Sequence, residues 1–71
     1  MIANDNELQV TLERIARMQK QVATLRQNET NPTNCRLAVS GFLAEIDRMQ
    51  LEVREYLRLH PTELADVVEP V

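Results

Sequence analysis

The sequence predicts an all-α protein, an antiparallel hairpin of two long helices that associates as a dimer into a four-helix bundle. Apolar residues recur at alternating spacings of three and four in two segments, the heptad pattern of helices packed at shallow angles. A stretch rich in Asn, Thr and Pro, residues 28–34, separates these segments. With 71 residues the chain is long enough for one small domain. We predict that this domain is a hairpin of residues 1–60, followed by a tail of residues 61–71.

The first helix is predicted at about residues 5–29. Asn4 stands where a capping residue is needed, and Glu7 follows three residues later, as in a capping box. The charges of Asp5 and Glu7 suit the positive end of a helix dipole. Its heptad positions are Leu8, Thr11, Ile15, Met18, Val22, Leu25 and Glu29, with Leu12 widening the stripe.

The second helix is predicted at about residues 32–59, after a turn at about 30–32. Proline disfavours helical backbone at the residue before it and suits the first position of a new helix, so Pro32 starts this helix with Asn31 as its cap. Because His60 precedes Pro61, the helix is expected to end near Leu59. Its heptad positions are Cys35, Val39, Phe42, Ile46, Met49, Val53, Tyr56 and His60.

The carboxyl-terminal segment, residues 61–71, combines acidic and apolar residues. Its Glu63, Asp66 and Glu69 carry the whole net charge of −3, since basic and acidic residues balance in the rest of the chain. Thr62 is expected to cap a short helix over residues 63–68, closed by Pro70. A frayed tail and a segment that orders on a partner are the alternatives.

The second helix carries more apolar residues than one seam can cover. Residues outside its heptad stripe form a further apolar flank: Leu37, Leu43, Ala44, Leu51 and Leu57. A helix with so wide an apolar face needs more than one neighbour, and two-fold dimers are the commonest soluble oligomers. A homodimer is therefore predicted. Its interface residues are Ile15, Met18, Val22, Leu25, Val39, Phe42, Leu43, Ile46, Met49, Leu51, Val53, Tyr56 and Leu57.

Small residues cluster around Phe42 in the second helix. Ala38, Ser40, Gly41 and Ala44 predict that a neighbouring helix approaches closely here, or that the helix bends. The alternative is a notch that accepts a partner's side chain, with Phe42 as the anchor.

The composition argues against several classes of protein. A lone Cys35 rules out a disulfide scaffold, and Cys35 with His60 falls short of the four ligands of a structural zinc site. We interpret Cys35 as a seam residue and His60 as a cap near a helix end. A single Gly excludes a Gly-rich phosphate loop, so neither a cofactor nor a metal is predicted. No long apolar run and no secretory signal are found, which predicts a cytoplasmic protein.

Neither a nucleic acid nor a membrane is a predicted partner. A small basic patch is expected on the first helix, at Arg14, Arg17, Lys20, Gln21 and Arg26. Glu13 and Glu29 flank it and no aromatic side chain accompanies it, whereas binding to a phosphate backbone needs clustered cations. The balanced charge also disfavours a basic amphipathic membrane helix.

The predicted function is a small protein–protein interaction module, an adaptor or regulatory subunit. A heterologous partner would bind the second flank (Leu43, Leu51, Leu57) or the tail (Leu64, Val67, Val68). One alternative is the neutralising partner of a toxin, whose acidic tail enters a basic active site. Another is a small metal-dependent hydrolase with a carboxylate site at the dimer interface. That enzyme would need inward-facing Glu45, Asp47, Glu52 or Glu55, although salt bridges to Arg48 and Arg58 explain these carboxylates more simply.

Overall fold

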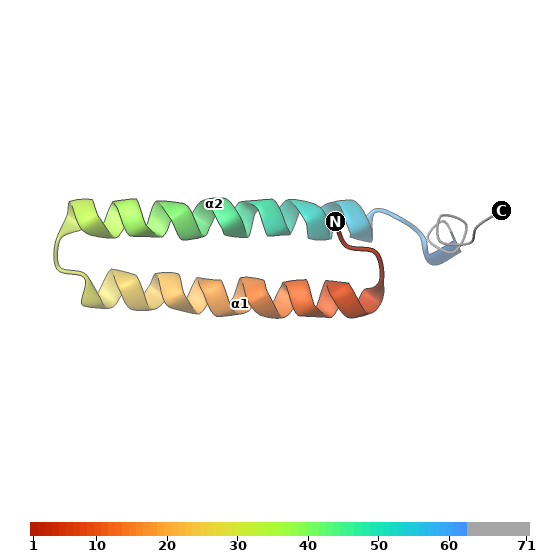
Figure 1. Ribbon diagram of the computed structural model, residues 1–71, viewed down its shortest axis with the longest axis horizontal. Helices are drawn as coiled ribbons and strands as arrows, with labels where there is room; N and C mark the ends of the chain where they lie inside the picture. The colour runs from red at the N-terminus through yellow and green to blue at the C-terminus, as the bar shows by residue number, and fades with distance from the viewer. Residues whose placement is uncertain (63–71) are drawn as a thin grey trace.

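The computed structural model describes residues 1–62 and shows two helices packed side by side. α1 spans Asp5–Asn28, and α2 spans Pro32–Leu57. They run antiparallel and are joined by a short turn (Figure 1). At about 1.5 Å per residue they are about 36 and 39 Å long. The prediction of an all-α helical hairpin is confirmed for this part of the chain. No helix in it carries an apolar stretch that would cross a bilayer.

The start of α1 is held by two hydrogen bonds that involve Glu7. The Asn4 side chain accepts a hydrogen bond of 2.8 Å from the backbone N–H of Glu7, a donor that a helix start otherwise leaves unpaired. The Glu7 carboxylate accepts one of 2.9 Å from the backbone N–H of Ala3. The second bond thus goes to the residue before the cap, whereas the expected capping box would return to Asn4 itself. The helix ends at Asn28, one residue before the expected end, and Glu29 takes extended backbone.

The turn between the helices consists of residues 29–31. The Asn31 side chain accepts hydrogen bonds from the backbone N–H groups of Thr33 and Asn34, at 2.9 and 3.2 Å. Pro32 follows at the first helical position, where a missing N–H costs nothing. The Glu29 carboxylate accepts a further bond of 3.1 Å from the Asn31 N–H. This bond links Glu29, the residue that follows α1, to Asn31, the capping residue of α2.

The end of α2 differs from the expectation. The helix stops at Leu57, and the N–H of Leu59 bonds to the carbonyl of Tyr56 in a tighter turn. His60 lies beyond the helix and is exposed, so its inclusion in the heptad stripe was wrong. The physical reason is Pro61, whose ring disfavours helical backbone at the preceding residue. The expected short helix over residues 63–68 lies outside the described residues.

The core is a single seam between α1 and α2. Ile15, Ile46 and Met49 form its centre with 3–6% exposure, and Met18, Val22 and Val53 pack against them. The other heptad positions from Leu8 to Val53 are half-buried, and Tyr56 is buried. No large side chain in residues 1–62 falls below 2% exposure. The hairpin therefore has a thin core, as expected of two helices without a third neighbour.

The amino-terminal residues add one core side chain that the heptad pattern missed. The chain before α1 turns back toward α2 (Figure 1), and Ile2 is buried. The amino group of Met1 lies 3.5 Å from the Glu52 carboxylate. Because Ile2 precedes the helix, it has no place in a helical repeat. The available signal was an isolated apolar residue two positions before the cap.

Candidate protein interaction surfaces

The predicted interface residues divide into two groups in the structure. Those at heptad positions lie between α1 and α2 of the same chain: Ile15, Met18, Val22, Leu25, Val39, Phe42, Ile46, Met49, Val53 and Tyr56. Those of the second flank, Leu43, Leu51 and Leu57, are exposed. The hairpin thus covers the first group within one chain and leaves the second group exposed.

One edge of the seam is lined with leucines. Each heptad contains two core residues, and three leucines come directly after the second of them. These are Leu12, Leu43 and Leu57, which are 40, 45 and 63% exposed. Arg26 and Arg36 hold the same heptad position, and together they line one hollow near the turn. This shared hollow shows that this heptad position of both helices borders the same edge. We call Leu12, Leu43 and Leu57 the leucine edge.

The predicted second flank is two surfaces rather than one. Leu37 and Leu51 are two heptads apart on α2, at the position opposite the seam, and are 70 and 54% exposed. Leu43 and Leu57 instead border the seam. Leu12, which was expected to widen the core stripe, lies on the leucine edge.

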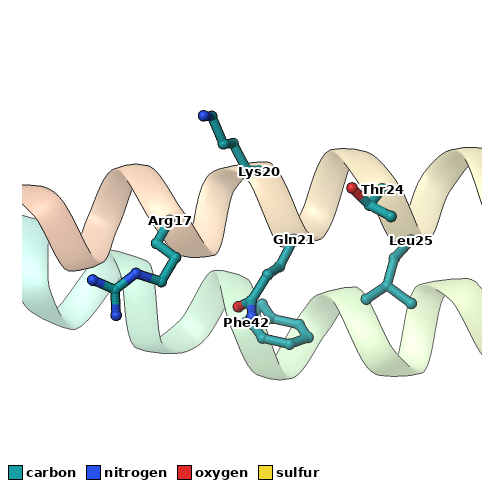
Figure 2. A pocket seen from close by; sticks show the side chains of 6 residues that line it. All are labelled: Arg17, Lys20, Gln21, Thr24, Leu25 and Phe42. Carbon is teal, nitrogen blue, oxygen red and sulfur yellow. The ribbon is translucent and has the colours of Figure 1, made fainter.

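The other edge of the seam opens beside Phe42. A hollow of about 450 Å³ is lined by Arg17, Lys20, Gln21, Thr24, Leu25 and Phe42. Figure 2 shows the Phe42 ring of α2 beside the Gln21 side chain of α1. A second hollow of about 350 Å³, lined by Met18, Ala38, Gly41 and Phe42, adjoins it through the shared ring. We call these two hollows together the Phe42 groove.

Gly41 does not mark a close approach within the hairpin. A Cβ placed on Gly41 would meet no atom within 4 Å. The neighbouring Ser40 hydroxyl donates a hydrogen bond of 2.6 Å to the Arg36 carbonyl on its own helix. The small residues therefore leave open space beside Phe42, which is the notch that the sequence offered as the alternative.

The basic patch expected on α1 is divided between the two edges of the seam. Arg17 and Lys20 line the Phe42 groove. Arg26 lies with Arg36 at the hollow near the turn, on the leucine side. The cations of this patch therefore do not form one continuous surface.

Three of the candidate metal-binding carboxylates have cationic neighbours, namely Glu45, Glu52 and Glu55, whereas Asp47 is exposed. Arg48 donates to Glu45 rather than to Glu52, and this hydrogen bond raises the pKa of the Arg48 guanidinium above its ordinary value. Glu55 lies 3.5 Å from Arg58, and Glu52 pairs with the amino terminus. Within residues 1–62, no three His, Cys, Asp or Glu side chains gather closely enough to hold a metal ion. Residues 1–62 of one chain thus offer the hydrolase alternative no metal site.

Cys35 and His60 lie near opposite ends of α2. Cys35 is a half-buried free thiol that lines the hollow near the turn. The His60 Nδ1 atom accepts a hydrogen bond of 3.1 Å from the backbone N–H of Thr62 and lies 2.8 Å from its hydroxyl. These contacts stabilise the turn after α2.

A hydrogen bond between Tyr56 and Asp5 joins the open ends of the two helices. The Tyr56 hydroxyl donates to the Asp5 carboxylate at 2.5 Å, although the two residues are 51 positions apart. This bond, burial of the ring and the negative charges of Asp5 and Glu7 raise the pKa of Tyr56 to about 12. The neutral phenol is therefore the form that the folded hairpin prefers.

The Tyr56 contact predicts a loss of stability in alkali. The phenol keeps its proton up to a pH of about 12 when folded, whereas its ordinary pKa is 10.0. The unfolded chain therefore releases this proton first, and the stabilisation that is complete below pH 10 declines as the pH rises toward 12. Urea unfolding followed by circular dichroism across this window measures the decline. Tyr56→Phe should show a shallower decline, and equal slopes for both proteins would contradict the assignment.

The chain matches no family model, no curated protein and no solved structure. The described residues form two apolar surfaces that are open to solvent, the leucine edge and the Phe42 groove.

Proposed function

We propose that the protein is a small interaction module, an adaptor or regulatory subunit, whose hairpins pair as a homodimer in a four-helix bundle. The observation that carries this proposal is the leucine edge. Three large apolar side chains from both helices lie exposed along one side of a thin core. Full burial of a leucine contributes about 1.5–3 kcal/mol, so covering the edge is a substantial source of stability.

The spacing of the leucine edge suits a second hairpin. Leu43 and Leu57 are fourteen residues apart on α2, which is about 21 Å along the helix. Ile15 packs with Ile46 and Met49, so Leu12, one turn earlier on α1, stands between the levels of Leu43 and Leu57. The three side chains are thus distributed along the hairpin rather than gathered at one end. A second copy related by a two-fold axis would present the same row in reverse.

Net charge on residues 1–62 does not oppose the pairing of two hairpins. All eight Lys and Arg residues precede residue 60, and three of the eleven acidic residues follow residue 62. The charges within residues 1–62 therefore balance, and two copies do not repel through net charge in this part. A dimer through the leucine edge also leaves the face of α2 opposite the seam, with Leu37 and Leu51, for a further contact. An adaptor needs such a further surface.

Sedimentation equilibrium of the full chain tests the proposal. We expect a species of twice 8.2 kDa. Circular dichroism melting at several protein concentrations should show a melting temperature that rises with concentration, because association stabilises the folded form by mass action. A species of 8.2 kDa with a concentration-independent melting temperature would overturn the proposal.

A further inference from the structure

Two methionines of the seam differ in how far solvent reaches them. Met49 is 3% exposed and forms the centre of the core with Ile15 and Ile46. Met18 packs against this centre from α1 but is only half-buried. Small solutes therefore reach the same chemical group, a thioether, more readily at Met18 than at Met49.

Access to Met18 comes through the hollow beside Gly41, which is part of the Phe42 groove. This hollow of about 350 Å³ is lined by Met18, Ala38, Gly41 and Phe42. A Cβ placed on Gly41 would meet no atom within 4 Å, so α2 leaves this space open. The space is several times larger than a water molecule needs, and hydrogen peroxide is little larger than water. The hollow borders the other edge of the seam from the leucine edge, so pairing of hairpins through that edge does not require it to be covered.

We propose that Met18 is a site of oxidation by peroxides and that this modification loosens the seam. A lone pair of the Met18 sulfur forms a bond to one oxygen of hydrogen peroxide, and the O–O bond breaks. The departing hydroxide takes the proton of the transferred hydroxyl and leaves as water. The thioether is thus oxidised to a sulfoxide, and the peroxide is reduced. Methionine sulfoxide reductases reverse the step with a dithiol, which becomes a disulfide while the oxygen leaves as water.

The sulfoxide oxygen needs a hydrogen-bond donor that the hollow does not supply. Ala38, Gly41 and Phe42 carry no donor on their side chains. All three lie within α2, where backbone N–H groups bond to carbonyls of the preceding turn. The oxygen therefore favours water, and reaching water draws the Met18 side chain out of the seam. Because the core is a single thin seam, this loss of packing weakens the contact between the two helices.

Peroxide treatment of the full chain, followed by peptide mass spectrometry, tests the access. All samples carry Cys35→Ser, so that oxidation of the thiol does not contribute. We expect Met18 to be oxidised at least about tenfold faster than Met49, since susceptibility follows exposure. Gly41→Leu should slow the oxidation of Met18, because its side chain fills the hollow.

Ser40→Leu is the matched control for Gly41→Leu. It places the same side chain at the adjacent exposed position of α2, outside the hollow, and should leave the rate at Met18 unchanged. Equal rates at Met18 and Met49 would overturn the proposal. An equal slowing of Met18 in both leucine variants would overturn it as well, because access would then not run through the hollow.

Thermal unfolding at fixed protein concentration tests the consequence. After treatment, the protein should melt several degrees lower, a shift that a modest loss of packing produces in a domain of this size. Met18→Leu has a side chain of similar volume without sulfur, so its melting temperature should not change on treatment. Met49→Leu is its matched control and should still show the decrease. A decrease that persists in Met18→Leu, or that is absent from Met49→Leu, would overturn the proposal.

Discussion

Replacing Ile46 by alanine is expected to lower the free energy of unfolding by about 2–5 kcal/mol. Ile46 is the most deeply buried residue together with Met49, and both pack against Ile15 on the facing helix. The truncation removes apolar contact and leaves a cavity between two helices that can close only partly. Since small proteins are stable by about 5–15 kcal/mol in total, this single change removes a large part of the stability.

Urea unfolding of Ile46→Ala at fixed protein concentration measures the effect. The concentration is held constant because association would otherwise shift the apparent stability. Leu37→Ala is the matched control, since Leu37 is exposed on the same helix and its loss should change the free energy by less than about 0.5 kcal/mol. Similar losses for the two variants would show that the seam does not dominate the stability.

Replacing Leu43 by glutamate is expected to weaken dimer formation by at least about tenfold. Leu43 lies near one end of the leucine edge, is 45% exposed in the single hairpin, and occurs twice in a two-fold dimer. Covering the exposed part contributes about 0.7–1.4 kcal/mol from each copy, or about 1.4–2.8 kcal/mol in all, and each 1.4 kcal/mol is a factor of ten in the dissociation constant. The new carboxylate adds the cost of burying an unpaired charge in the interface.

Leu37→Glu is the matched control for Leu43→Glu. Both changes place the same charge on α2, and leucine and glutamate have similar helix propensities, so neither should disturb the helix itself. Leu37 lies opposite the seam, and its variant should sediment as the unaltered protein does. If Leu43→Glu remained a dimer while Leu37→Glu dissociated, the outer face of α2 rather than the leucine edge would be the interface.

Much of the hairpin could be predicted because its signals are local. The spacing of three and four placed Ile15, Ile46 and Met49 on the seam, and the structure buries all three. Pro32 with Asn31 marked the start of the second helix, where the Asn31 side chain accepts two backbone N–H groups. Such patterns operate within one or two helical turns, and a linear sequence displays them directly.

The leucine edge and the Phe42 groove required the three-dimensional structure. The sequence grouped Leu43 and Leu51 as one flank, because both fall outside the heptad stripe. Which of them borders α1 depends on how α2 is rotated about its own axis within the pair. The open space beside Gly41 likewise depends on the distance between the helices there, which the bulk of neighbouring seam side chains decides.

The sequence by itself determined the all-α class, the antiparallel hairpin and the residues of its seam. Only the tertiary structure decided that Tyr56 bonds to Asp5 and that Ile2 is buried. The physical reason is the distance along the chain between the residues that meet. Periodicity and capping act between residues a few positions apart, whereas these contacts depend on the alignment of two helices and on a segment outside any repeat.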